Sequence, residues 1–162
     1  MKKIMAMMLF FFVAGGADEI QDKLRQTKAT NSILFFYAPW CPACAKSADI
    51  LNTAQKNHPT KLKIIGIDLD DGKHRKNFLK NTRFRFETQK MSLKETKKYG
   101  VDKSIPVIYV LDDKQQVVKK YFKTPNKDVF LKLIDRLQKG FLANGTLPAE
   151  QRIDLWKMDR RQ

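Results

Sequence analysis

The chain has 162 residues and a formal net charge of +15, and 43% of its residues are hydrophobic. This length suits one domain with its own core and is short for two. The lysines are spread along the chain, so a solvated basic surface is the simpler interpretation, with transient contact to an anionic membrane surface as the alternative. No nucleic-acid-binding motif accompanies the charge, and nucleic-acid binding is therefore not expected.

The first 17 residues have the order of a secretory signal peptide. Lys2 and Lys3 precede the apolar run 4–13, and small residues occupy 14–17 ahead of the first acids. The apolar run is shorter than the ~20 residues that a membrane-spanning helix needs. We therefore expect cleavage near Ala17 and a periplasmic protein, with an uncleaved membrane anchor as the alternative.

Hydrophobic periodicity after residue 17 predicts alternating helices and strands. The expected helices cover 18–28, 41–58, 76–81, 92–99 and a segment opened by 124–126, and the expected strands cover 33–37, 62–69, 107–111 and 116–122. Strands joined through helices are expected to run parallel, and the last pair, joined by a tight turn, antiparallel. The fold class is therefore α/β: a central mixed sheet with helices on both faces over 18–140, followed by a C-terminal extension over 141–162.

Local signals support the later elements. Ser92 followed by Glu95 is a capping box, and Gly100 is a helix stop. Phe84 and Phe86 alternate with arginines, and we expect an edge strand that covers the core here rather than a cation–π contact face for a partner. The final helix is expected to place these residues on its inner face: Val129, Phe130, Leu133, Ile134 and Leu137.

The two cysteines stand close together, in the sequence Cys41-Pro42-Ala43-Cys44. A disulfide across so short a loop constrains little of the unfolded chain, so reactivity explains the pair better than a structural role does. The chain has only two histidines and no His-rich cluster, so a four-ligand metal site has weak support. We expect no metal, and no cofactor beyond the redox-active disulfide itself.

The expected strand–helix junction places Cys41 at a helix N-terminus. Free N–H groups and the partial positive charge there favour a thiolate over a thiol. Cys44 lies one turn later on the same face, within reach of a disulfide. We therefore expect Cys41 to be the exposed nucleophile and Cys44 the buried thiol that resolves a mixed disulfide. Pro42 holds the first helical turn, where its missing N–H costs nothing.

The run 35–44, Phe-Phe-Tyr-Ala-Pro-Trp-Cys-Pro-Ala-Cys, resembles the active-site strand and helix of thioredoxin-like proteins. The segments 98–101 and 104–107, Lys-Tyr-Gly-Val and Ser-Ile-Pro-Val, resemble the family's segment that ends in a cis-proline facing the dithiol. The resemblance covers 18–139 and implies a thioredoxin-like fold, thiol–disulfide exchange and a cis Ile105–Pro106 bond.

The same resemblance implies the substrate-binding residues. The Ile105 backbone would offer strand-like hydrogen bonds to a substrate chain, and Pro106 would shape the groove beside it. Trp40, adjacent to the first cysteine, is expected to be a contact surface rather than a catalytic group. Pro42 and Ala43 would form the active-site helix turn between the cysteines.

Three departures from the family pattern limit what the resemblance implies. Phe35 stands where cytoplasmic thioredoxins have a buried aspartate that helps the resolving thiol lose its proton, so Asp49, Asp68 or water would have to serve. The Pro-Ala dipeptide leaves the reduction potential open, and its lack of a histidine, together with Ile105, favours reduction of partner disulfides over oxidation. The segment 73–90 is longer than a minimal thioredoxin needs, as in several exported relatives.

We therefore expect a monomeric periplasmic thiol–disulfide oxidoreductase. Its partners would be protein thiols and disulfides, together with an electron donor of the membrane or periplasm. The alternative is a thioredoxin-fold scaffold or chaperone module of an envelope assembly, without turnover. The basic surface, the segment 73–90 and a tail containing Trp156 favour that alternative.

Overall fold

The computed structural model describes residues 17–70, 75–82, 84–102 and 104–140. The expected signal peptide, except Ala17, and the expected C-terminal extension lie outside the described residues. The elements in chain order are α1 (Ala17–Arg25), β1 (Asn31–Tyr37), α2 (Pro42–Asn57), β2 (Leu62–Asp68), α3 (Arg75–Thr82), β3 (Glu87–Lys90), α4 (Leu93–Thr96), the 3-10 helix η1 (Lys97–Tyr99), β4 (Val107–Leu111), β5 (Val117–Tyr121) and α5 (Lys127–Gln138). Within the described part of the chain, none of the helices has the length and apolar character needed to cross a membrane.

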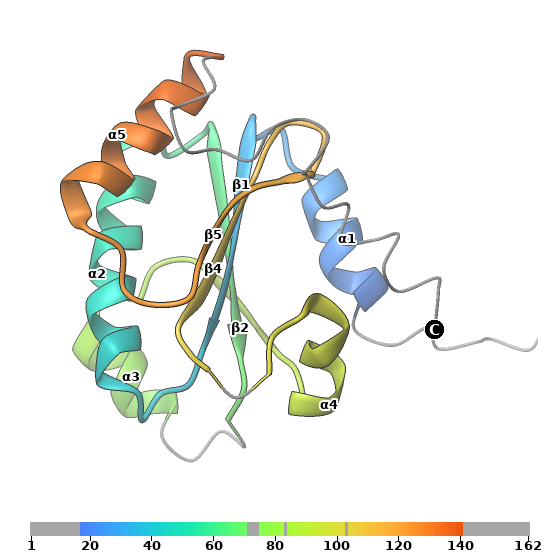
Figure 1. The fold of residues 1–162 in the computed structure, drawn as a ribbon, viewed down its shortest axis with the longest axis vertical. Coiled ribbons are helices and arrows are strands. Elements are labelled where there is room, and N and C mark those ends of the chain that lie inside the picture. The colour runs from blue at the N-terminus through green and yellow to red at the C-terminus, as the bar shows by residue number, and fades with distance from the viewer. Residues whose placement is uncertain (1–16, 71–74, 83, 103, 141–162) are drawn as a thin grey trace, which may run out of the picture.

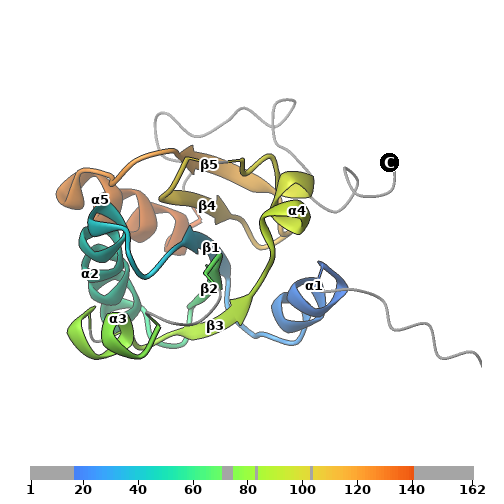
Figure 2. The same ribbon diagram turned by 90° about the horizontal axis from the view of Figure 1, so that it is seen from below.

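The strands form one mixed sheet in the order β3-β2-β1-β4-β5. The central strand β1 pairs parallel with β2 and antiparallel with β4. β3 is parallel to β2 at one edge, and β5 is antiparallel to β4 at the other. Helices α2, α3 and α5 lie on one side of this sheet, and α1 and α4 on the other (Figures 1 and 2). The expected α/β fold class is confirmed.

One prediction about strand direction was wrong. The expectation that helix-linked strands run parallel would make β4 parallel to β2, but β4 runs antiparallel to β1 and hence to β2. The two helices before β4, α4 and η1, have only four and three residues. The connection from β3 to β4 covers residues 91–106, but neither of its helices is long enough to carry the chain back along a strand, as the helix of a parallel crossover does. The chain therefore re-enters the sheet from the end at which β3 finished.

The predicted helix signals hold in the structure. Ser92 caps α4, with its Oγ accepting the Glu95 N–H at 3.3 Å while the Glu95 carboxylate accepts the Ser92 N–H at 2.8 Å. Gly100 ends η1 with φ +68°, a left-handed conformation that glycine adopts without steric cost. Asn126 caps α5 through its side-chain oxygen. Val129, expected on the inner face of α5, is 61% exposed, so that assignment was wrong.

Between β2 and α4 the described residues form α3, which is the helix expected around 76–81, and the strand β3. The strand begins at Glu87, after the two phenylalanines, so the edge strand expected around Phe84 and Phe86 was misplaced. Both rings nevertheless cover the core: the Phe84 and Phe86 ring centroids lie 6.0 Å and 6.4 Å from that of Phe35. They do not form the outward contact face that was the alternative.

Strand residues alternate between two hydrophobic cores. The face toward α2, α3 and α5, here called the dithiol face, contains both cysteines, with Phe35 and Tyr37 from β1. The opposite face, here called the α1 face, contains Ile20 and Leu24 from α1, with Leu34 and Phe36 from β1 and the rings of Tyr99 and Tyr109. Every residue of β1 is buried, as predicted for a strand covered on both sides.

Candidate active site

The dithiol lies where β1 ends and α2 begins. The chain turns after Tyr37, and the Cys41 N–H donates to the Ala38 carbonyl at 3.1 Å. Cys41 is the N-cap of α2, and Pro42 is the first residue of the helix. The predicted strand–helix junction is therefore confirmed, and it places the Cys41 sulfur at the positive end of a helix of 16 residues.

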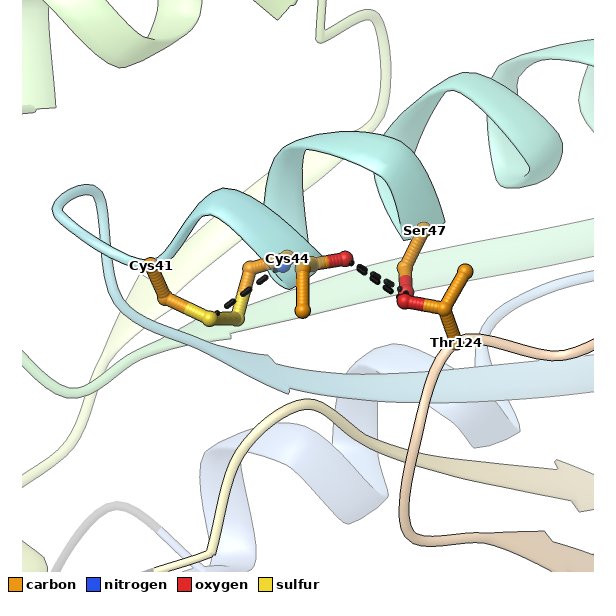
Figure 3. The surroundings of a disulfide bond; sticks show 5 residues. Cys41, Cys44, Ser47 and Thr124 are labelled. Carbon is orange, nitrogen blue, oxygen red and sulfur yellow. Dashed lines mark hydrogen bonds between the residues drawn. A yellow bond between two sulfur atoms is a disulfide. The ribbon is translucent and has the colours of Figure 1, made fainter.

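The two cysteines are joined in a disulfide, with their Cα atoms 5.2 Å apart (Figure 3). The Cys44 N–H donates to the Cys41 sulfur at 3.2 Å. Cys44 is fully buried, whereas 7% of Cys41 is exposed. The order of exposure follows the prediction, although Cys41 reaches the surface only narrowly. A helix N-terminus with an N–H group directed at the sulfur favours a thiolate once the disulfide is reduced.

A pocket of about 280 Å³ opens beside Cys41. Trp40, 63% exposed, lines it from the turn before α2. Asn77, Phe78 and Asn81 line it from α3. The segment 73–90 therefore reaches the active site, although the sequence alone assigned it no role. Asn and Phe on a surface helix carry no catalytic signature, so no sequence signal marked them.

The Ile105–Pro106 peptide bond is cis, as the family resemblance implied. Phe36 pairs with Val107 in the register of β1 and β4, so Pro106 lies level with Tyr37, near the start of α2. Ile105 packs, partly buried, against the core that contains both cysteines. The residues expected to form a substrate groove are thus at the dithiol end of the sheet.

A phenylalanine ring fills the position of the family's buried aspartate. Phe35 is fully buried and stacks on Tyr37 with ring centroids 5.2 Å apart. Asp49 is exposed and lines a separate cavity of about 800 Å³ beside α2. Asp68 is 1% exposed at the end of β2, in register with Tyr37, and its Oδ1 accepts the Asp70 N–H at 3.0 Å. Of the two acids considered from the sequence, only Asp68 is buried at the dithiol end of the sheet.

A polar contact next to the dithiol was not predicted from the sequence. The Thr124 hydroxyl donates to the Ala43 carbonyl at 2.9 Å. The Ser47 hydroxyl lies 3.0 Å from that carbonyl and 3.0 Å from the Thr124 hydroxyl (Figure 3). Thr124 is 81 positions from Ala43 along the chain, so no motif around the cysteines could have indicated it.

Among the described residues, no three His, Cys, Asp or Glu side chains lie together in an arrangement that could hold a metal ion. His58, at the far end of α2 from the cysteines, has its Nε2 2.6 Å from an Asp135 carboxylate oxygen. His74 lies outside the described residues.

Comparisons with known proteins agree with this site. A segment of 55 residues is 42% identical to "Thioredoxin 2" of Plasmodium berghei (strain Anka); it is 33% of this chain and about a third (35%) of the relative's length. A thiol:disulfide interchange protein of the thioredoxin family from Chlorobium tepidum TLS has a TM-score of 0.61 and 19% identity, over 73% of this chain and 84% of that one. A secreted disulfide oxidoreductase of Mycobacterium tuberculosis has a TM-score of 0.58 and 17% identity, over 65% and 81%.

At these identities the solved structures establish the fold alone, which is thioredoxin-like, as expected from the sequence. Family membership rests on the sequence. The model of the AhpC/TSA family matches residues 12–130, from before α1 into α5. Because this match covers well over half of the chain, the protein belongs to the AhpC/TSA family.

Proposed function

We propose that the protein is a thiol–disulfide oxidoreductase that exchanges disulfides with protein partners through Cys41 and Cys44. The observation that carries the proposal is the geometry of the pair. Cys41, at a helix N-terminus, accepts an N–H at its sulfur and is 7% exposed, and Cys44 is fully buried one turn later. This is the arrangement that a nucleophile and a resolving thiol require.

The reaction transfers two electrons from the dithiol to the partner. The Cys41 thiolate attacks one sulfur of a partner disulfide, forms a mixed disulfide and releases the partner's other sulfur as a thiolate. Cys44 then loses its proton and attacks the Cys41 sulfur, which releases the second partner thiolate and leaves the Cys41–Cys44 disulfide. With Phe35 in place of an acid, water or Asp68 takes the Cys44 proton; the burial of Asp68 near Tyr37 favours it over Asp49.

The substrate chain is proposed to lie across Cys41, the more exposed of the two cysteines. Ile105 and Pro106, at the dithiol end of the sheet, would supply one wall and the backbone contacts of the groove. Trp40 would supply an exposed aromatic surface on the other side. Pro42 and Ala43 keep the first helical turn in the conformation that presents Cys41.

The direction and location belong to the same proposal. The absence of a histidine between the cysteines removes one group that would stabilise the thiolate, which favours a reductase over an oxidase. The order of residues in 1–17 and the similarity of the fold to that of a secreted oxidoreductase support action in the periplasm. Its electron donor would then be a membrane or periplasmic protein, and the protein would act as a monomer without a separate cofactor.

Reduction of insulin disulfides, with dithiothreitol as the electron source, tests the proposal. The Cys41→Ser variant should fall to the uncatalysed rate, and the Cys44→Ser variant should accumulate mixed disulfides on Cys41. Equal rates for the wild-type protein and Cys41→Ser would overturn the assignment. Equilibration with glutathione then tests direction, because a potential near about −270 mV indicates a reductant and one near about −120 mV an oxidant.

A second candidate function is a thioredoxin-fold scaffold or chaperone module of an envelope assembly. The narrow exposure of Cys41, 7%, favours it, because a disulfide that partners cannot reach would stay closed. Capture with a Cys44→Ala variant separates the two functions. Partners joined by a disulfide support catalysis, whereas partners retained in reductant and by a variant lacking both cysteines support a scaffold.

A further inference from the structure

The peptide group between Ala43 and Cys44 is hydrogen-bonded at both of its ends. Its N–H, which belongs to Cys44, donates to the Cys41 sulfur at 3.2 Å. Its carbonyl, which belongs to Ala43, accepts the Thr124 hydroxyl at 2.9 Å and lies 3.0 Å from the Ser47 hydroxyl. Figure 3 shows this peptide group between the sulfur on one side and the two hydroxyls on the other.

The two hydroxyls come from different elements. Ser47 is fully buried on α2, and Thr124 is in the connection between β5 and α5. Their oxygens lie 3.0 Å apart. Each hydroxyl has one proton, so Thr124 can donate to the Ala43 carbonyl while Ser47 donates to the Thr124 oxygen or to the same carbonyl. Either arrangement directs at least one O–H at the carbonyl.

We propose that Thr124, supported by Ser47, stabilises the Cys41 thiolate through the Ala43–Cys44 peptide group. This inference rests on the proposed function, in which Cys41 is the nucleophile. The carbonyl and the N–H are parts of one resonant amide, so a donor at the oxygen makes the N–H a stronger donor. A thiolate gains more from that donor than a disulfide sulfur does, because bonds to a charged acceptor are stronger. Thr124 is thus a positioning residue that acts through the peptide.

The direction of the effect on the redox equilibrium follows from which form of Cys41, the thiolate or the disulfide, the hydrogen bond stabilises more. Stabilising the thiolate lowers the pKa of Cys41 and favours the reduced pair, which makes the disulfide more oxidising. Removing the Thr124 hydroxyl should therefore raise the Cys41 pKa and shift the couple toward the disulfide. Hydrogen-bond chains strengthen each member by about 10–30%, which for a bond to a charged group corresponds to a change in equilibrium of about twofold.

The test compares the wild-type protein with Thr124→Val, which keeps the shape and removes the hydroxyl, and Thr124→Ser, which keeps the hydroxyl. Thr53→Val is the matched control: the Thr53 hydroxyl donates to the Asp49 carbonyl at 3.0 Å, a bond of the same kind farther along α2. Two quantities are measured: the ultraviolet absorbance of the Cys41 thiolate against pH, and the equilibrium constant with glutathione.

In Thr124→Val the ratio of thiolate to thiol at a given pH should fall about twofold. The glutathione equilibrium should move about twofold toward the disulfide, which is about 9 mV at about 30 mV per tenfold change. Thr124→Ser and Thr53→Val should match the wild-type protein. A Thr124→Val variant that loses thermal stability but keeps the wild-type titration and equilibrium would show a purely structural hydroxyl and overturn the inference.

The Ser47→Ala variant provides a second test. If Thr124→Val does not fold, Ser47→Ala should show a smaller shift in the same direction, and an unchanged titration in Ser47→Ala would then count against the inference. Thiolate titration needs no turnover, so it remains informative if insulin reduction fails. Failure of the proposed function would appear as equal insulin reduction by the wild-type protein and Cys41→Ser, whereas failure of this inference would appear as unchanged titrations.

Discussion

The two faces of the sheet are similar in burial but differ in chemistry. The dithiol face packs both cysteines of the chain against rings that include Phe35 and Tyr37, and a pocket opens from it beside Cys41. The α1 face is covered by α1 and α4, and it contains a buried hydrogen bond in which the Tyr109 hydroxyl donates to the Tyr99 carbonyl at 2.7 Å. Burial raises the pKa of Tyr109 to about 12, so this group keeps its proton at neutral pH.

The comparison shows that one strand, β1, supports both faces through alternate residues. Phe35 faces the cysteines, and its neighbour Leu34 faces α1. Substitutions on the two faces should therefore cost similar stability, yet only those on the dithiol face should change thiol chemistry. Substitutions on each face, followed by both unfolding and thiol chemistry, test that separation.

The largest effect is expected for Phe35→Ala. The ring is fully buried and has ring neighbours at 5.2 Å and 6.0 Å, so its loss leaves a cavity beneath the dithiol. Urea unfolding should show a loss of about 3–5 kcal/mol, and the glutathione equilibrium should shift as well. Leu34→Ala, the neighbouring position on the other face, should lose about 2–5 kcal/mol with no shift in that equilibrium. A shift of equal size in both variants would contradict the separation of the faces.

Leu24→Ala tests the α1 face alone. Leu24 is 1% exposed in the helix that covers this face, and truncating it should cost about 2–4 kcal/mol in urea unfolding. Insulin reduction measured well below the midpoint of unfolding should stay at the wild-type rate. The same truncation at Leu93, which is 52% exposed, serves as the control and should cost less than about 0.5 kcal/mol. Loss of reductase rate in folded Leu24→Ala would show that the faces are coupled.

The sequence predicted the parts of the site that depend on neighbours along the chain. A buried run, a turn and a helical repeat placed Cys41 at the N-cap of α2, and one-turn spacing placed Cys44 beneath it. The cis Ile105–Pro106 bond came from the family resemblance, because local chemistry gives most X-Pro bonds as trans.

The missed features depend on contacts between distant segments. Thr124 meets Ala43 across 81 positions, and Asn77 and Asn81 reach the dithiol only because α3 packs beside α2. The direction of β4 could not be predicted from its own residues either. It depends on the end of the sheet at which the chain arrives after α4 and η1. Val129 was misplaced because an apolar residue near a helix end satisfies the pattern without facing the core.

Gly66→Ala should disturb the dithiol face from the neighbouring strand, β2. A Cβ atom at this position would lie 2.9 Å from Phe84 Cε1 and 3.1 Å from Tyr37 Cε1. The rings must shift to relieve the contact, so urea unfolding should show a loss of about 1–3 kcal/mol. The double variant Gly66→Ala with Phe84→Leu should lose less than the sum of the two single variants. Strict additivity would show that the Phe84 ring does not limit the space at Gly66.

The smallest effect concerns Glu87, whose two ion pairs link α1 to β2 and β3: its carboxylate lies 2.9 Å from Lys23 Nζ and 2.8 Å from Lys63 Nζ. Hydrogen bonds from Lys63 and then Lys23 lower the pKa of Glu87 in the folded protein. The ion pairs therefore stabilise the fold at pH values above the pKa that Glu87 has in the unfolded chain. This stabilisation is lost as the pH falls through the pKa of Glu87 in the folded protein. Because the Glu87 side chain is 37% exposed, Glu87→Gln should cost only about 0.5–1 kcal/mol at pH 7.

When urea unfolding is repeated toward pH 3, the difference in stability between Glu87→Gln and the wild-type protein should shrink. A difference that stays constant with pH would exclude the ion pairs as its source. High salt at pH 7 should reduce the difference in the same way, since screening weakens exposed pairs.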